Sequence, residues 1–246
     1  METHINNIVS IFEYFSTEIN DDKTNFRNAD VWNNINTALR RIYRIELLIG
    51  IESKLDQKKP QQFPLVKKGG SYSQIYSTQY KANDVLKIEF SMFYPNIICR
   101  LHEEEILDLD IKYESFYYLI KKYKLIRGLL STDGKMCLKM YVNYFYGKKL
   151  AKDERELVTG RGYSIMEHFT KYDGWIYADT DIFFIKDSIG LDEKLKNELS
   201  ILELPYELEY IREMLVIEPK RYVEIDINGI GKIHGRYAGS KERKNK

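Results

Sequence analysis

Two aspartates separated by one residue are the first feature of this sequence that could do chemistry. Asp179 and Asp181 flank Thr180 in the segment IYADTDIFFI, where a polar break divides two apolar runs. Carboxylates held this close repel each other unless a cation neutralises them, and hard divalent cations such as Mg²⁺ prefer carboxylate oxygens. The tripeptide therefore predicts either a divalent-metal site or the commoner alternative, a surface turn with two solvated aspartates.

Glu89 is a third acid in a context that predicts a strand. It lies in the apolar segment KIEFSMFYPNII, five residues before Tyr94. A lone strand glutamate usually points to solvent, so Glu89 indicates a reactive site only together with other acids.

The segment KMYVNYFYG at 139–147 carries polar side chains at helical spacing. Lys139, Asn143 and Tyr146 stand at positions i, i+4 and i+7, which places a cation, an amide and a ring on one helix face. An amphipathic helix packed on a core is the alternative, but a lysine and an asparagine on such a face require a partner.

Charge is segregated along the chain although the totals nearly cancel. Lys and Arg number 38 against 37 Asp and Glu, a net charge of +1, so composition alone indicates no partner. Residues 103–114 hold six acids and one lysine, whereas residues 121–149 hold eight cations and one acid. The 20 tyrosines suit stacking on bases, with a coding bias toward A and T as the alternative. A solvated helix face would also explain the cationic segment.

The elements that must position these residues follow from the apolar periodicity. Residues 1–60 predict a two-helix support, and the proline-containing segment 57–64 with the turn KKGGSYS at 67–73 predicts a boundary near residue 65. From residue 85 an apolar β-type run ends at Pro95, and charged helical segments follow.

The second half of the chain predicts further strands. Residues 174–187 predict a hairpin with the acids at its tip, and strand-like segments precede a basic tail. We therefore expect an α+β fold. An antiparallel sheet carries Glu89 and the 179–181 hairpin side by side, helices back it, and a helical insertion spans about residues 99–147.

Length and composition exclude several classes of protein. The 246 residues suffice for a large core, and the two cysteines, Cys99 and Cys137, support neither a disulfide framework nor a zinc knuckle. The N-terminal segment METHINNIVSIF lacks the basic region of a secretory signal, and no 18 apolar residues follow one another. We expect an intracellular, cytoplasmic protein that does not engage a membrane.

Four segments, in order, resemble the motifs of family B DNA polymerases. EFSMFYPNII resembles motif A, KMYVNYFYG motif B, YADTD motif C and KRY the KxY motif, over about residues 66–235. The KKGG turn at 67–70 resembles the glycine motif that precedes motif A, especially in protein-primed members, with Lys67 where an aromatic residue is usual. The resemblance implies an N-terminal helical support at 1–65, a palm at 66–98 and 148–235, fingers at 99–147 and a basic tail at 236–246.

The resemblance also implies DNA-directed DNA polymerase activity by two-metal nucleotidyl transfer. Two Mg²⁺ ions, which Mn²⁺ can replace, activate the primer 3′-hydroxyl and neutralise the triphosphate. The implied bridging ligands are Glu89 and Asp181, with the Phe90 carbonyl as a further ligand and Asp179 as an auxiliary acid.

Further residues are implied to bind dNTPs and primer–template DNA. Lys139 contacts the triphosphate with help from Arg127 and Lys135. Tyr94 stacks under the sugar and excludes a 2′-hydroxyl. The residues implied to contact the nascent base pair, the DNA or the primer strand are Asn143, Tyr146, Gly147, Gly69, Gly70, Lys220 and Tyr222.

The sequence departs from the family pattern in several places. Glu89 stands where the family has Asp, which adds one methylene and roughly 1.5 Å of reach. Met92 and Asn96 replace serines around motif A, and Ile182 replaces the serine after motif C. The extra methylene either requires a strand set further back or weakens catalysis.

Two modules usual in the family have no room in this sequence. About 65 residues precede the KKGG turn and 11 follow Gly235, too few for an exonuclease or a thumb. We therefore expect an enzyme without proofreading, from a virus or mobile element, that depends on a clamp-like processivity partner or a terminal protein.

Two other functions stay open at this point. A catalytically weakened palm could serve as a DNA-binding or scaffolding subunit of a split polymerase. A template-independent nucleotidyltransferase would extend single strands without templated choice.

Overall fold

The computed structural model describes residues 2–21, 29–48, 73–75, 80–107, 114–187 and 191–235. The chain divides into two compact units, a helical unit of residues 1–61 and 95–155 and a sheet unit of residues 62–94 and 156–246. The expected linker at 57–64, the KKGG turn with Gly69 and Gly70, and the basic tail at 236–246 lie outside the described residues.

The helical unit joins the N-terminal helices to the segment that follows Pro95. Its elements are α1 (Glu2–Asp21), α2 (Ala29–Leu48), most of α3 (Phe93–Glu103), α4 (Glu114–Lys121), α5 (Tyr123–Leu129), α6 (Thr132–Tyr144) and the π-helical turn η3 (Phe145–Lys149). Phe12 of α1 packs edge-on against Tyr141 of α6, and Trp32 of α2 stacks on Tyr144. Rings spaced along amphipathic helices thus form the core of this unit.

Helix α6 begins at a cap that a residue of α1 supports. The Ser131 hydroxyl accepts a hydrogen bond from the Gly134 N–H (3.1 Å), and Glu13 accepts one from the Ser131 N–H (2.6 Å). An N-cap of this kind satisfies amide groups that the first helical turn leaves unpaired. The N-terminal helices and the expected fingers segment therefore share one packed unit.

The described residues of the sheet unit form seven antiparallel strands and two helices, of which α7 begins in the helical unit. They are β1 (Ser73–Ile75), β2 (Tyr80–Phe90), β3 (Trp175–Asp179), β4 (Ile182–Lys186), β5 (Tyr206–Glu218), β6 (Arg221–Asp226), β7 (Gly231–His234), α7 (Lys152–Phe169) and α8 (Leu191–Leu202). The strand order is β1-β3-β4-β2-β5-β6-β7. The expected α+β fold is confirmed, with the Glu89 strand next to the 179–181 hairpin.

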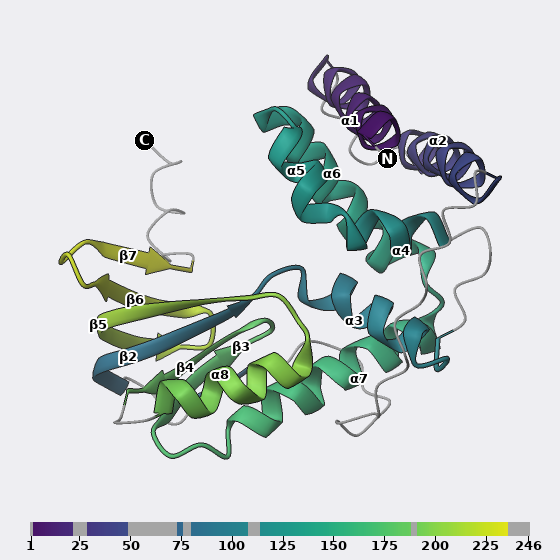
Figure 1. Ribbon diagram of the computed structural model, residues 1–246. Coiled ribbons are helices and arrows are strands. Elements are labelled where there is room, and N and C mark those ends of the chain that lie inside the picture. Colours follow the sequence, from purple (N-terminus) through teal and green to yellow (C-terminus); the bar gives the residue numbers. More distant parts are fainter. Residues whose placement is uncertain are drawn as a thin grey trace, which may run out of the picture. The chain divides into compact units, whose positions relative to one another are not determined.

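One face of the sheet packs against helices. Phe169 of α7 stacks on Phe183 (ring centroids 4.6 Å apart), and both rings contact Phe90 of β2. Figure 1 shows α7 and α8 along the same side of the sheet.

A polar contact joins these two helices, since His168 Nε2 of α7 lies 2.8 Å from Glu198 Oε2 of α8. Burial raises the pKa of Glu198, but the Tyr172 hydroxyl and the His168 ring beside it outweigh that effect, so the net pKa is lowered.

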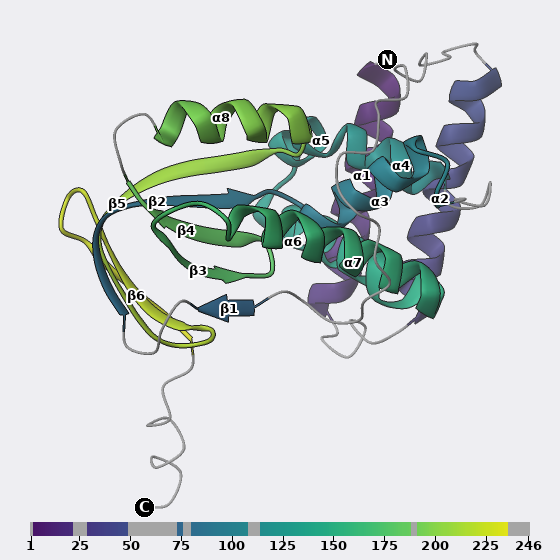
Figure 2. The same cartoon turned by 90° about the horizontal axis from the view of Figure 1, so that it is seen from below.

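The opposite face of the sheet is covered in part by the sheet's own strands, because the strands are curved. Val85, Tyr177, Phe184, Met214 and Tyr222 belong to one buried cluster, although they lie on five different strands. Figure 2 shows β6 running steeply across the direction of β3 and β4. This curvature brings residues of β6 over the face that carries Tyr177, and it is what a strongly twisted antiparallel sheet allows.

The end of the first long strand differs from the sequence expectation. The β-type run was expected to reach Pro95, but β2 ends at Phe90 and α3 begins at Phe93. Pro95 lies in the first turn of α3, where a backbone N–H has no partner within the helix, so a proline is tolerated. Directly after β2, the Ser91 N–H donates a hydrogen bond to the Pro205 carbonyl (2.8 Å).

Among the described residues, no helix is both long and apolar enough to cross a membrane.

Candidate active site

The hairpin predicted for residues 174–187 is confirmed, with both aspartates at its tip. β3 ends at Asp179 and β4 begins at Ile182, and the Asp181 N–H bonds the Asp179 carbonyl across a three-residue turn (2.8 Å). Thr180 adopts φ = 61°, which is unfavourable for a β-branched residue. Its hydroxyl donates to Asp179 Oδ1 (3.0 Å). The strained turn therefore fixes two carboxylate residues next to each other.

Strand register brings Glu89 to the same end of the sheet. Ile182 of β4 pairs with Glu89 of β2 on one side and with Asp179 of β3 on the other. Directly paired residues of antiparallel strands point to the same face, so the side chains of Glu89 and Asp179 share a face across Ile182. The Phe90 N–H also bonds the Asp181 carbonyl (2.8 Å). The structure thus places Glu89 and Asp179 on one face, with the Asp181 backbone in the turn beside them.

Two more residues lie in this row without having been predicted. Glu207 of β5 pairs with Glu89, and Ser73 of β1 pairs with Asp179. The alternating acids of the segment YELEY were a possible signal for Glu207, since residues two apart on a strand share a face.

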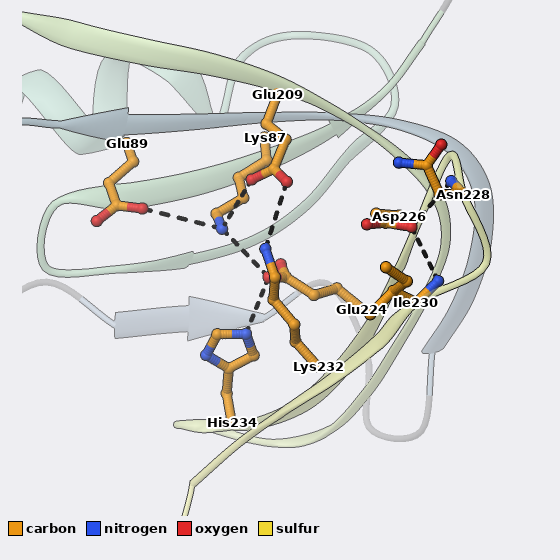
Figure 3. Close-up of polar contacts among 9 residues, drawn as sticks. All are labelled: Lys87, Glu89, Glu209, Glu224, Asp226, Asn228, Ile230, Lys232 and His234. Atoms are coloured by element: carbon orange, nitrogen blue, oxygen red, sulfur yellow. Dashed lines mark hydrogen bonds and ion pairs between the residues drawn. The ribbon is translucent and has the colours of Figure 1, made fainter.

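A buried lysine contacts Glu89 on its own strand. Lys87 Nζ lies 3.2 Å from Glu224 Oε1, 3.3 Å from Glu209 Oε2 and 3.9 Å from Glu89 Oε2 (Figure 3). Burial lowers the pKa of Lys87, but Glu224 and Glu209 together outweigh that effect and raise it. Lys87 is therefore a charged ammonium in the protein interior. Sequence reasoning missed it, although a lysine inside the apolar segment VLKIEF was a signal.

Glu224 is the most deeply buried acid of this network. It is 1% exposed, and its Oε1 also lies 3.0 Å from His234 Nε2. Within the described part of the chain, its Oε2 has no hydrogen-bond partner. Figure 3 shows that Lys232 and His234 reach the network from β7, after a turn in which Asp226 accepts hydrogen bonds from the Asn228 and Ile230 N–H groups.

Lys220 and Tyr222 of the KRY segment have different environments. Tyr222 is buried, stacks on His234 (ring centroids 4.3 Å apart) and contacts Tyr177. Burial raises the pKa of Tyr222, and the charges of Glu224 and Glu89 raise it further. Lys220 is exposed at φ = 66°, and its N–H donates to the Tyr177 hydroxyl (2.8 Å).

The residues predicted to bind nucleotide lie mainly in the helical unit. Lys139 and Asn143 lie on one helix, α6, as their spacing predicts, and both are exposed. Arg127 is exposed on α5. Lys135 is partly buried on α6.

Tyr146 was expected on the same α-helical face as Lys139 and Asn143, but the α-helix ends at Tyr144 and a π-helical turn begins at Phe145. Tyr146 lies in the π-helical turn η3, so its position relative to Asn143 differs from that in a regular α-helix. Burial raises the pKa of Tyr146. Apart from the chain immediately around it, no atom of the described residues lies within 4 Å of a Cβ placed on Gly147, so this glycine leaves open space.

Tyr94 lies shortly after the end of β2, the strand that carries Glu89. It is partly buried in the first turn of α3, with its ring 5.5 Å from that of Phe93. Phe93 in turn stacks on Phe90 (5.0 Å). This aromatic chain links the position of Tyr94 to the strand that carries Glu89.

Glu89, Asp179 and Asp181, here called the acid row, offer the donor atoms that suit a hard divalent cation. Glu89, Asp179 and Asp181 are each partly exposed and offer carboxylate oxygens, the ligands that Mg²⁺ and Mn²⁺ prefer. These residue types fit such an ion. Their side chains are not arranged around one, since over the described ranges no group of three or more His, Cys, Asp or Glu side chains is placed to hold a metal ion.

No protein-family model and no curated protein matches this sequence. Among solved structures, the chain is similar to the family B DNA polymerase of the hyperthermophilic archaeon Pyrobaculum calidifontis, with 19% identity and a TM-score of 0.50 over 71% of this chain and 30% of that one. It is also similar to phi29 DNA polymerase complexed with single-stranded DNA, with 10% identity and a TM-score of 0.51 over 83% of this chain and 61% of that one.

These similarities define the class of fold. The chain has a polymerase-like α+β fold, and it spans less than two thirds of the length of either polymerase. At such low identities the likeness concerns the fold alone, because one fold serves many activities.

Proposed function

We propose that this chain is a DNA-directed DNA polymerase that adds dNTPs to a primer 3′-hydroxyl. The observation that carries the proposal is the convergence of Glu89, Asp179 and the Asp181 turn at one end of three adjacent strands in a polymerase-like fold. The likeness to a polymerase described in complex with single-stranded DNA supports DNA as the partner. In this proposal residues 66–98 and 148–235 act as the palm and residues 99–147 as the fingers.

The proposed ligands of two Mg²⁺ or Mn²⁺ ions are Glu89, Asp181, Asp179 and the Phe90 carbonyl. Bound divalent ions supply charge stabilisation to the attacking hydroxyl and the leaving pyrophosphate. The strained turn at Thr180 holds its two neighbours in place before any substrate binds. This preorganisation is the contribution of the protein to the chemistry.

Other residues are proposed to bind and orient the substrates. Lys139, with Arg127 and Lys135, supplies positive charge for the triphosphate, and exposed Lys220 contacts the primer phosphates. Tyr94 selects the deoxyribose. Gly69, Gly70, Asn143, Tyr146 and Gly147 complete the proposed contacts to DNA. Tyr222 acts from the buried cluster, where it supports the strand that follows Lys220.

Primer extension tests this proposal directly. Wild-type protein with primer–template DNA, dNTPs and Mg²⁺ or Mn²⁺ should extend the primer, and Asp181→Asn should lower the rate by at least roughly 100-fold. Glu213→Gln is the matched control, because Glu213 is an acid of the same sheet that pairs with Lys81 on the distant half of β2. Reactions with each single dNTP separate templated synthesis from template-independent transfer. No extension by wild type or by Glu89→Asp with either metal would refute polymerase activity.

A scaffolding subunit is the second candidate function. The 3.9 Å contact between Lys87 and Glu89 favours it, since a carboxylate paired with a lysine is less available to a metal ion. In that case the protein binds primer–template DNA with similar affinity with and without divalent ions, and Asp181→Asn leaves this affinity unchanged. Fluorescence anisotropy with labelled DNA measures both.

A further inference from the structure

Lys87 is a fixed cation on the face that carries the candidate metal ligands. Its side chain is 9% exposed, and it lies two residues before Glu89 on β2, so both side chains point to the same face. Glu224 of β6 and Glu209 of β5 hold the ammonium at 3.2 and 3.3 Å (Figure 3). Three strands thus fix its position.

Glu89 is much less constrained than this lysine. Its side chain is 47% exposed, and its Oε2 lies 3.9 Å from Lys87 Nζ, at the outer limit of an ion pair. The same face carries Asp179 and Glu207 in the row of Glu89. Without a nearby cation, like charges in one row would repel each other.

We infer that Lys87 is an internal counter-ion of the acid row, a positioning residue that holds Glu89 in the metal-free protein and competes with the divalent ion for its carboxylate. This inference rests on the proposed function, since it concerns the same acids. It also gives the glutamate at position 89 a role. One additional methylene gives its carboxylate roughly 1.5 Å more reach, enough for it to turn between the lysine and a metal ion.

The inference predicts the direction in which metal affinity changes. Removing a unit positive charge 3.9 Å from Glu89 should tighten Mn²⁺ binding about sixfold in the dielectric of water, and more where the site is drier. A purely structural role of Lys87 would lower stability equally with and without metal. A counter-ion role instead makes the thermal stability of Lys87→Met depend more strongly on Mn²⁺ than that of wild type.

Mn²⁺ titration of the full-length protein, followed by electron paramagnetic resonance, tests the inference. Lys87→Met should bind about sixfold more tightly than wild type, while Lys87→Arg, which keeps the charge, should stay within about twofold. Lys81→Met is the matched control, since Lys81 forms an exposed ion pair with Glu213 between the same two strands, and its affinity should equal that of wild type. If Lys87→Met does not fold, Lys87→Met/Glu224→Gln removes both buried charges and should still bind at least about twofold more tightly.

The outcomes separate this inference from the proposed function. Wild-type binding that Asp181→Asn abolishes, together with unchanged affinity in the folded Lys87 variants, would overturn the counter-ion role and leave the metal site intact. If wild type binds no Mn²⁺ at millimolar concentration, the proposed metal site is wrong, and the role of Lys87 falls with it.

Discussion

The hydrogen bond between Tyr177 and Lys220 should stabilise the turn that carries the proposed primer contact. Tyr177 is fully buried on β3, and its hydroxyl accepts a hydrogen bond of 2.8 Å from the Lys220 N–H. Lys220 is a non-glycine residue at φ = 66°, a conformation that costs roughly 1–2 kcal/mol. Tyr177→Phe removes only the hydroxyl and keeps the ring contacts. Because water can reach exposed Lys220 and replace the acceptor in part, we expect a loss of about 1–1.5 kcal/mol.

Thermal unfolding measures this loss in the sheet unit. With Trp32 replaced by Phe in all variants, Trp175 of β3 is the remaining tryptophan and its fluorescence reports on the sheet. At about 2–4 °C per kcal/mol for a chain of this size, Tyr177→Phe should lower the Tm by roughly 3–5 °C. Tyr210→Phe is the matched control, since Tyr210 is an exposed residue of the same sheet, and it should change the Tm by less than about 1 °C.

The same variant connects the turn to DNA binding. If the turn holds Lys220 against the primer, Tyr177→Phe should weaken primer–template binding by up to about fivefold, the equivalent of about 1 kcal/mol. Equal Tm values for Tyr177→Phe and Tyr210→Phe would refute the reasoning, because they would mean that the Lys220 N–H gains nothing from its buried acceptor.

Three further predictions concern other parts of the chain. Thr180→Gly should raise the Tm by about 2 °C, because glycine relieves the backbone strain at φ = 61° at a smaller entropic cost; an unchanged or lower Tm would contradict this. Burial raises the pKa of the Cys137 thiol to about 12 and that of Cys99 as well, so both should react with a thiol reagent at least about 100-fold more slowly in native than in urea-unfolded protein; rapid native labelling would show that the helical unit opens. The lowered pKa of Glu198 adds stability that is present above its ordinary value of 4.5 and is lost as the pH falls through the folded value. Acid titration by circular dichroism should therefore show a smaller loss of stability below pH 4.5 for Glu198→Gln than for wild type, and identical curves would oppose it.

The sequence predicted the local parts of the site because their signals are local. The apolar runs around Asp179 and Asp181 predict a hairpin from neighbouring residues alone, and the spacing of Lys139 and Asn143 places them on one face of a helix. The expectation that the β-type run reaches Pro95 was wrong, because the apolar residues after Phe90 continue into α3, whose first turn tolerates a proline. The change to a π-helical turn at Phe145 had no signal in the pattern.

The Lys87 network could not be predicted, since its members lie far apart in the chain. Lys87 and Glu224 are 137 residues apart and meet only because β5 and β6 curve over one face of the sheet. Tyr222 shows the same limit, because the resemblance implied a contact to the primer strand, whereas the fold buries its ring.

By itself the sequence determined which residue types stand at strand ends, turns and helix faces, because burial of apolar side chains sets those patterns at short range. It therefore determined the α+β class and the acids that could carry chemistry. Only the tertiary structure decided that Ile182, which faces Asp179 in the hairpin, also pairs with Glu89 of β2, and that a buried lysine lies beside Glu89. The register between strands far apart in the sequence and the curvature of the sheet depend on packing over the whole sheet, so the patterns of single segments do not determine them.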